Sequence, residues 1–227
     1  MRLFLSLLLA LQQDDAAVQA DAAVAQFKVA YKNPDVKARA EAVAALGKTQ
    51  HPKTGKILAG LLQADEPPVR RRAAEMLGQW TSKQADISVL IQGAVRPNNR
   101  EPLVLSALYD AMGNLRDKSA VDDVNNSLNH LNNEVSVAAI RAAGKLGSSK
   151  SVDRLISMWV AVDEYRNPRP STDGKLNTRQ RTPEWDLRYG MQEPALRDAV
   201  NAITKKSFGN MYEAREWWNA NRATFRE

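Results

Sequence analysis

Apolar residues recur along most of this chain at helical spacing, and one ten-residue pattern returns several times. Its clearest copy is Val69–Gly78, which reads Val-Arg-Arg-Arg-Ala-Ala-Glu-Met-Leu-Gly. Altered copies end at Gly47, Gly113 and Gly147, each after an apolar residue, and a degenerate copy ends at Thr204. Apolar positions at i, i+3, i+4 and i+7 are typical of one face of a helix. The pattern therefore predicts an array of repeated helical units.

The distance between successive glycine markers gives the length of each unit. From the first marker to the fourth, the intervals are 31, 35 and 34 residues. Periods in this range indicate supersecondary units that bury their apolar faces only against neighbouring units. Asn33, Asn99 and Asn133 each lie 14 residues before a marker, and Asp65 stands one place later in the second unit. We expect these side chains to cap the second helix of each unit.

Two further features of the pattern concern helix ends and helix contacts. We expect Gly47 to end its helix in the left-handed conformation, which glycine adopts without steric strain. Alanine recurs five residues before the marker, where a small side chain allows two helices to approach closely. These alanines are Ala42, Ala73, Ala142 and Ala199.

The shared ending Val-Arg-x-x-Ala-Ala-x-x-Leu-Gly resembles the short HEAT-like repeat, and the resemblance covers residues 21–206. The Thr-Pro-Leu-His segment of ankyrin repeats and the spaced aromatic residues of tetratricopeptide repeats are absent from the sequence. The resemblance implies an all-α fold, namely an α-solenoid of about five helix pairs. It also implies that Arg39 and Arg70 stack against acidic neighbours between repeats.

Residues 1–20 have the layout of a secretory signal peptide. A short basic start, Met1-Arg2, precedes nine mostly apolar residues that end at Leu11. This run is far shorter than the roughly 20 residues of a membrane-spanning helix. We therefore expect export, cleavage between about Gln13 and Asp21, and a secreted or periplasmic location. The alternative is that the run forms a buried first helix.

The fifth unit is longer than the others because an insertion at residues 165–188 separates its two helices. The insertion is rich in Pro, Asn, Thr and Ser, which predicts a loop. Between residues 165 and 183 it has one acidic residue, Asp173, and five basic residues that are candidates for partner binding. These are Arg166, Arg169, Lys175, Arg179 and Arg181. A loop of this length is either a binding element or a disordered insert, and the sequence leaves both open. We expect Trp185 to anchor it.

Arg70, Arg71 and Arg72 are a second set of candidate partner-binding residues. Together with Lys37 and Arg39 they could form a basic stripe along the first two units. In the competing interpretation these arginines are solvated or form ion pairs between repeats. Arginine suits an acidic partner because its planar guanidinium can donate two parallel hydrogen bonds to one carboxylate.

Residues 207–227 predict a C-terminal capping helix, because the last unit of a solenoid would otherwise expose an apolar face. Asn210 is suited to begin this helix. Four residues would line its buried face: Met211, Ala214, Trp218 and Phe225. We expect Trp217 and Trp218 to pack against the solenoid. The combination of Phe208-Gly209 with a Trp-Trp helix resembles the ends of secreted bacterial HEAT-like proteins.

The amino-acid composition narrows the classes of function that we expect for this protein. The chain has no cysteine and two histidines, and no phosphate-binding or catalytic motif, so we expect no enzyme activity, cofactor or metal site. The net charge of +6 favours acidic partners. We expect a monomeric, non-enzymatic interaction scaffold of the cell envelope or exterior, which binds a protein or an acidic polymer. The alternative is a nucleic-acid-binding or DNA-base-processing protein, supported by the basic stripe and five tryptophans; export disfavours it.

Overall fold

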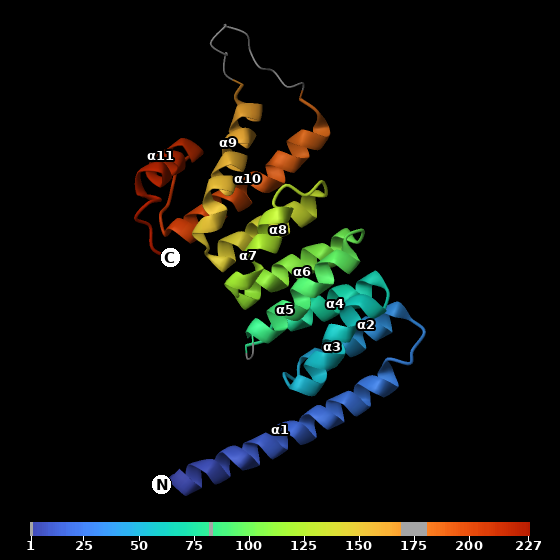
Figure 1. Cartoon of the computed structure of the whole chain (residues 1–227). Coiled ribbons are helices and arrows are strands. Elements are labelled where there is room, and N and C mark those ends of the chain that lie inside the picture. Colours follow the sequence, from blue (N-terminus) through green and yellow to red (C-terminus); the bar gives the residue numbers. More distant parts are fainter. Residues whose placement is uncertain (1, 82–83, 169–180) are drawn as a thin grey trace. The chain divides into compact units, whose positions relative to one another are not determined.

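The computed structural model of the chain describes residues 2–81, 84–168 and 181–227, with side chains from Asp15 onward. Within these residues the regular secondary structure is helical and no strand occurs, which confirms the predicted all-α class (Figure 1). The α-helices are α1 (Arg2–Ala30), α2 (Val36–Gly47), α3 (Pro52–Ala64), α4 (Pro67–Leu77), α5 (Gln84–Val95), α6 (Pro102–Leu115), α7 (Val121–Ser127), α8 (Asn133–Leu146), α9 (Val152–Arg166), α10 (Pro183–Thr204) and α11 (Met211–Asn221). Three short 3-10 helices are η1 (Arg96–Asn98), η2 (Lys118–Ala120) and η3 (Ser149–Ser151).

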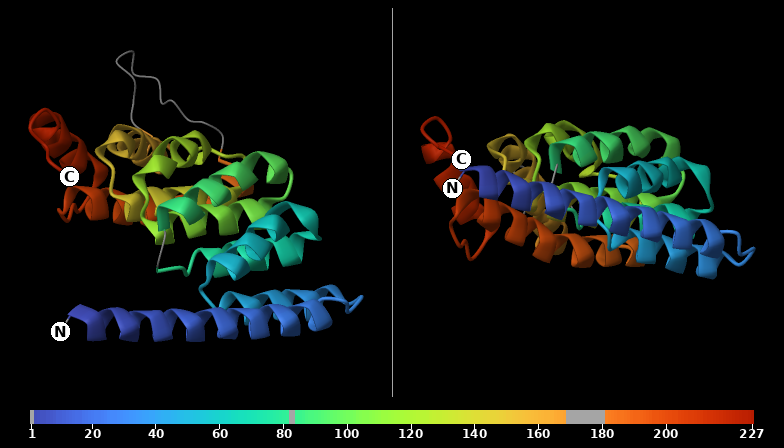
Figure 2. Two further views of the ribbon diagram at one scale, coloured as in Figure 1. Left: turned by 60° about the horizontal axis from the view of Figure 1, so that its bottom comes forward. Right: turned by 90° about the horizontal axis from the view of Figure 1, so that it is seen from below.

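Successive helices of the described chain form five pairs, from α1 with α2 to α9 with α10, and α11 follows the last pair. This arrangement confirms the predicted α-solenoid with a C-terminal helix. The chain divides within α6 into two compact units, Met1–Ala111 and Met112–Glu227. Inside each unit the two helices of a pair run in opposite directions (Figure 2).

The first unit is held together by contacts between helices of equivalent position. The second helices α2 and α4 contact each other, and the first helix α3 contacts both α1 and α5. Leu46, Leu62 and Leu77 are each at most 1% exposed. Burial of a leucine side chain contributes about 1.5–3 kcal/mol relative to exposure, so this apolar layer is the main source of stability.

The second unit has the same arrangement around α8. This helix contacts α7 within its own pair and α10 of the next pair, and α10 in turn contacts α9. Most of α8 is buried, from Val135 at its start to Leu146 at its end. Its position between two other helices explains why most of its side chains are buried.

The C-terminal helix α11 packs against α9, as the capping interpretation predicts. Asn210 caps it by accepting hydrogen bonds from the backbone N–H groups of Tyr212 and Glu213. Trp218 is 4% exposed, and its indole N–H donates to Asp153 at 2.9 Å. Trp217 lies half-buried against the rings of neighbouring phenylalanines. Both tryptophans therefore contribute to packing.

Most of the glycine markers serve close packing and not helix termination. Gly47 lies in the right-handed last turn of α2, so the expectation of a left-handed residue there was wrong. A Cβ atom at this position would lie 2.5 Å from the Cβ of Met76 on α4. Only Gly147 among the described glycines has a positive φ, of 69°. In the second unit Gly144, three residues earlier, takes the packing role, since its Cβ would lie 2.9 Å from the Cα of Ala199.

Three of the predicted helix caps are displaced by one or two residues. Glu66, not Asp65, is the N-cap residue of α4. Asp35, not Asn33, caps α2 by accepting a hydrogen bond from the backbone of Lys37. Asn132, not Asn133, caps α8. The error arises because neighbouring polar residues are equally suited to capping, and only the chain's path decides between them.

The predicted leader and the predicted insertion between α9 and α10 also differ in part from what the sequence predicts. The helix α1 is continuous from Arg2 to Ala30, through the predicted leader. The predicted insertion at residues 165–188 is too long at both ends, because α9 continues to Arg166 and α10 begins at Pro183. Residues 169–180 lie outside the described part of the chain.

Close packing at the markers gives the first testable prediction. A Cβ atom at Gly78 would lie 2.7 Å from the Cα of Ala111, whereas one at Gly93 on α5 meets nothing within 4 Å. We expect Gly78→Ala to lower the free energy of unfolding by about 1–3 kcal/mol through overpacking. The matched change Gly93→Ala should raise it by roughly 0.5–1 kcal/mol, because alanine has the higher helix propensity. Urea unfolding measures both values, and equal effects of the two changes would contradict the packing role.

Candidate partner-binding grooves

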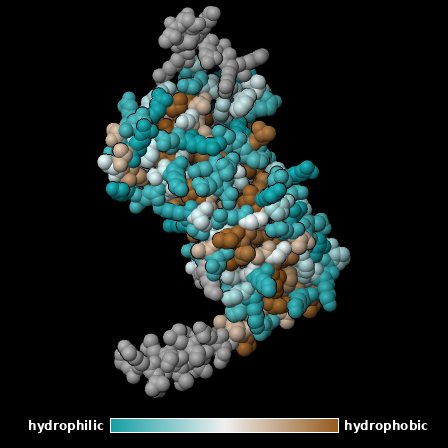
Figure 3. Space-filling model, viewed as in Figure 1, coloured by the Kyte–Doolittle hydropathy of each residue, from teal (hydrophilic) through white to brown (hydrophobic). Residues whose placement is uncertain are grey.

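Basic residues and surface grooves identify candidate partner-binding sites on this protein better than apolar patches do. The face of the molecule seen in Figure 3 is mostly hydrophilic, and its apolar residues lie in small separate areas. No large apolar patch therefore marks a binding surface among the described residues of that face. The positions of the predicted basic residues and of the grooves are more informative.

The basic residues of the insertion are only partly described. Arg169, Lys175 and Arg179 lie outside the described residues. Arg166, in the last turn of α9, forms an ion pair with Glu193 of α10. Arg181 forms an ion pair with Asp186 at 3.1 Å, and its guanidinium lies over the ring of Tyr165. The two described arginines therefore have carboxylate partners within the protein.

The arginines of the clearest repeat copy also have partners. Arg71 and Arg72 are both bound to Glu75, one helical turn later on α4, at 2.7 Å each. They line a groove of about 480 Å³ on the second helices of the first unit, together with Lys37 and the exposed Leu103. The shared carboxylate reduces the positive charge that this groove offers to an acidic partner.

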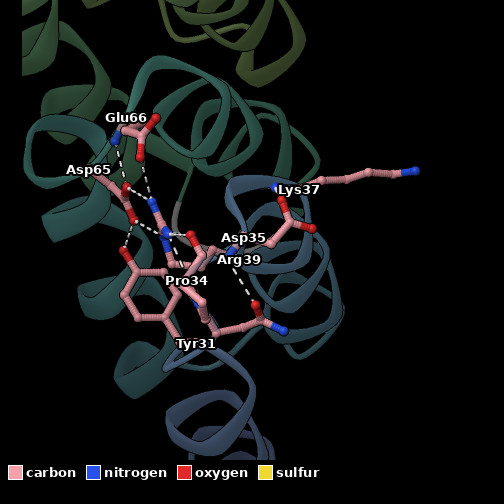
Figure 4. Close-up of polar contacts among 8 residues, drawn as sticks. Tyr31, Pro34, Asp35, Lys37, Arg39, Asp65 and Glu66 are labelled. Atoms are coloured by element: carbon pink, nitrogen blue, oxygen red, sulfur yellow. Dashed lines mark hydrogen bonds and ion pairs between the residues drawn. The ribbon is translucent and has the colours of Figure 1, made fainter.

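Arg39 is the centre of a polar cluster that joins α1, α2 and the turn between α3 and α4 (Figure 4). Its guanidinium binds both oxygens of Asp65, at 3.0 and 3.2 Å, and also reaches Glu66 at 2.9 Å. The hydroxyl of Tyr31 donates to the same Asp65 carboxylate. Asp65 was expected to cap α4, and the structure uses its side chain for this inter-repeat contact instead. The stacking of Arg39 against an acidic neighbour is thus observed.

The cluster changes the protonation behaviour of its members. Burial raises the pKa of Tyr31 to about 12, and the hydrogen bond to the Asp65 carboxylate adds to this effect. Burial alone would raise the pKa of Asp65, but hydrogen bonds from Arg39, Tyr31 and the Glu66 backbone hold this pKa below its usual value. Asp65 therefore stays ionised in the folded protein, where its negative charge is paired.

Arg70 makes the equivalent contact one repeat later. Its guanidinium donates to the side-chain oxygen of Asn98 at 2.9 Å and lies 3.7 Å from Glu101. Asn98 is fully buried, and its amide donates to the backbone oxygens of Leu62 and Ala94. Asn99, the predicted cap of α6, lies instead at the end of η1. Arg39 and Arg70 are therefore structural, which favours the ion-pair interpretation over a basic stripe.

Four of the five tryptophans are at least partly buried. Trp80, Trp159 and Trp218 are each at most 4% exposed, and Trp217 is half-buried. Trp185, in the first turn of α10, is 43% exposed. The aromatic support for the nucleic-acid alternative is therefore reduced to one exposed side chain. The loop that Trp185 was expected to anchor lies mostly outside the described residues.

Trp185 lies in a groove of about 710 Å³ in the second unit, which we call the aromatic groove. The groove is bounded by the turn between α7 and α8, by α9 and by the first half of α10. Its lining residues are Asn129, Leu131, Asn133, Arg154, Ser157, Met158, Ala161, Glu184, Trp185, Arg188, Tyr189 and Gln192. Leu131 is 94% exposed, although it belongs to an apolar side-chain class that is usually buried.

Arg188 fixes the geometry of the aromatic groove. Its Nη1 donates to the backbone oxygens of His130 and Leu131 and to the side chain of Asn133, at 3.0–3.2 Å. Its guanidinium also lies over the Trp185 ring, 5.8 Å from the ring centre, and Trp185 in turn contacts Tyr189. Burial lowers the pKa of Arg188, since no carboxylate offsets the loss of hydration.

Arg154 contributes a second positive charge to the aromatic groove. This exposed residue of α9 has no ion-pair partner within the described chain. The groove therefore combines the exposed ring of Trp185, which lies on the buried Tyr189, with two cations that have no carboxylate partner among the described residues. Sequence analysis missed it, because Arg154, Arg188 and Leu131 are far apart in the chain and each is ordinary for its helix or turn.

Searches of the described residues gave two negative results. No helix there combines the length and hydropathy needed to cross a bilayer. No group of three or more histidine and acidic side chains there is arranged to hold a metal ion. His51 instead caps α3, and His130 accepts a hydrogen bond from the backbone of Asn132.

Comparison with known protein families gives one match. The family model for HEAT repeats matches residues 24–102 and 87–167. The two matches together cover residues 24–167, which is more than half of the 227 residues. None of the curated proteins matches the chain in sequence.

The Arg39 cluster gives a second testable prediction. Arg39→Gln leaves the Asp65 carboxylate, whose side chain is 9% exposed, without its cation, and we expect a loss of about 1–3 kcal/mol in the free energy of unfolding. The matched change Arg71→Gln, at an exposed pair, should stay within about 0.5 kcal/mol. Urea unfolding at neutral pH measures both.

The same cluster sets a pH dependence with a definite sign. The folded-state pKa of Asp65 is below its unfolded value, so its contribution to stability is present above about pH 3.9 and is lost as the pH falls through the folded pKa. The wild-type protein should therefore lose more stability than Arg39→Gln between neutral pH and about pH 3. Parallel acid unfolding curves for the two proteins would contradict this assignment.

Proposed function

The chain belongs to the HEAT-repeat family, whose repeats generally mediate protein interactions, and we propose that it is a non-enzymatic interaction scaffold of the cell envelope or exterior. The aromatic groove is its main site for a partner protein. The observation that carries this proposal is the exposed Trp185 beside Arg188, a cation that has no carboxylate partner within the described part of the chain.

The residue types in the aromatic groove support a protein partner. Tryptophan, tyrosine and arginine are the residues that most often dominate the energy of protein–protein interfaces, and they act best in well-formed pockets. Trp185 contacts both the guanidinium of Arg188 and the buried ring of Tyr189. Arg188 also holds the α7–α8 turn, so the site is organised before a partner arrives, which reduces the entropy lost on binding.

The charged residues that line the aromatic groove indicate which chemical groups a partner would present to it. Glu184 is the only acidic residue among the lining residues, whereas Arg154 and Arg188 are basic. A partner that presents an apolar side chain to Trp185 and a carboxylate to Arg154 would complement this surface. The proposal is therefore a protein partner with apolar and acidic groups side by side.

The envelope location rests on the leader-like residues 1–20. Described contacts of α1 and the turn after it with the rest of the first unit include an ion pair between Asp21 and Lys53 and the hydrogen bond from Tyr31 to Asp65. Removal of the residues before about Asp21 would leave both contacts in place. An exported protein of this length would thus keep the solenoid that begins at residue 21.

A crosslinking experiment tests the proposed function. A photoreactive amino acid replaces Leu131, whose side chain is 94% exposed at the rim of the aromatic groove. The full chain is expressed in its native host and irradiated, and the envelope fraction is analysed for crosslinked protein. We expect one main partner, and Trp185→Ala should reduce its capture by about tenfold or more. N-terminal sequencing of the same sample should begin between about Gln13 and Asp21.

Leu187→Ala is the matched control for this experiment. Leu187 is 60% exposed on the same helix but does not line the groove, so its removal should leave capture unchanged. Equal loss with both variants would show a general effect on α10 and contradict the site. Capture of nucleic acid in place of protein would support the alternative function, and an intact Met1 in a cytoplasmic fraction would overturn the location.

A further inference from the structure

A second groove of the second unit is strongly basic, and nothing in the repeat pattern pointed to it. It has a volume of about 580 Å³ and lies along the second helices α8 and α10. Its lining residues are Arg116, Val137, Arg141, Gly144, Lys145, Gly147, Met191, Pro194, Ala195, Asp198, Ala199, Ala202 and Lys205. We call it the basic groove. Four of these residues are basic and one is acidic.

The positive charge of the basic groove is not neutralised within the described chain. Lys145 donates to the side-chain oxygen of Asn114, and Lys205 donates to the backbone oxygen of Ala202, so both bind neutral groups. Arg116 and Arg141 are exposed and form no ion pair with a described residue. The one carboxylate, Asp198, is 3.5 Å from Arg197, which lies outside the groove.

Three of the four cations have an obvious structural role, but the fourth does not. Arg116, Lys145 and Lys205 stand at or near the C-terminal ends of helices, where a positive charge is favoured by the helix dipole. Arg141 lies in the middle of α8, exposed and without a carboxylate partner. It follows Val137 and precedes Lys145 by four residues each, so the three side chains share one face of α8. Helix stability alone does not account for this arrangement.

The floor of the groove is apolar and built from small residues. Gly144 and Ala199 approach so closely that a Cβ on the glycine would lie 2.9 Å from the alanine's Cα. Ala195, Ala202 and Pro194 extend this surface along α10. None of the described residues that line the groove is aromatic, and proteins that bind single-stranded nucleic acids without sequence preference stack bases on aromatic rings. A shallow apolar floor with a cationic rim instead matches an amphipathic helix with acidic flanks.

We propose that the basic groove binds an acidic amphipathic helix of a partner protein. The basic side chains receive the carboxylates of the helix, and the floor receives its apolar stripe. A second copy of this chain is a poor occupant, because each copy carries a net charge of +6. The inference stands independently of the aromatic groove, which is lined by a different set of residues.

The test uses a designed peptide as the probe. It is a fluorescein-labelled helical peptide of about four turns, with leucine on one face and glutamate on both flanks. Fluorescence anisotropy measures its affinity for the full-length protein, and a peptide with glutamine in place of glutamate is the charge control. We expect binding of the glutamate peptide that weakens with added salt, because the contacts lie at an exposed rim.

The decisive comparison is between two double variants that lose the same charge. Arg141→Ser with Lys145→Ser should weaken binding of the glutamate peptide by about tenfold or more. Lys56→Ser with Arg96→Ser removes two exposed cations of the first unit that have no described ion-pair partner, and should weaken binding less than about twofold. Circular dichroism and thermal unfolding confirm that both variants remain folded.

Three results would overturn the inference. Equal weakening in both double variants would mean that only the overall charge attracts the peptide. Equal affinity for the glutamate and glutamine peptides would mean that the rim does not recognise carboxylates. Tighter binding of a labelled oligothymidylate, lost in the Arg141→Ser/Lys145→Ser variant, would assign the groove to nucleic acid. A Trp185→Ala variant that loses its crosslinked partner but still binds the peptide would separate this inference from the proposed function.

Discussion

The close approach of successive second helices is the constraint on which the rest of the structure depends. At Gly47, Gly78 and Gly144 the neighbouring helix lies so near that a single added methyl group would overlap it. Gly78 and Gly144 each meet an alanine, and Gly47 meets Met76, so the second helices approach closely and the larger apolar residues fill the space between first and second helices. The stack of repeats is therefore set by small residues and stabilised by large ones.

The arginines of the two units differ in their partners. Where second helices of the first unit meet, Arg39 and Arg70 bridge from one repeat to the next and are mostly buried. In the second unit Gln192 of α10 donates to Ser136 of α8, and Arg188 of α10 donates to Asn133. Arg116 and Arg141 form no ion pair with a described residue, and both line the basic groove.

Much of the fold could be predicted from the sequence. The repeat phase, the buried alanines and the role of Arg39 followed from the Val-Arg-x-x-Ala-Ala-x-x-Leu-Gly pattern, because a repeat imposes equivalent surroundings on equivalent residues. The exact caps could not be predicted, since Asn33 and Asp35 are both good capping residues. The role of Gly47 was also hidden, because a glycine near a helix end is suited both to a left-handed turn and to close packing.

The candidate sites were harder to predict than the fold. Sequence analysis singled out runs of arginine, and the structure shows that Arg71, Arg72 and Arg166 have carboxylate partners. Partners one turn away along a helix can be anticipated, as for Arg71 and Glu75, but pairs across repeats cannot. Apart from Arg141 and Lys145, which share one face of α8, the cations of the two grooves come from different helices and turns. Only the folded chain brings them together, so no local motif could reveal them.

We propose that the arginines paired across repeats hold the repeats together, whereas the exposed arginines without a described partner bind another protein. NMR spectra of the arginine Nε–Hε groups, recorded while the acidic helical peptide is added, distinguish these two roles. The Nε–H proton of Arg39 donates to Asp65, so it should exchange slowly with water, and its signal should not move. The signal of the exposed Arg141 should shift as the peptide binds. A shift at Arg39 with none at Arg141 would contradict this division of roles.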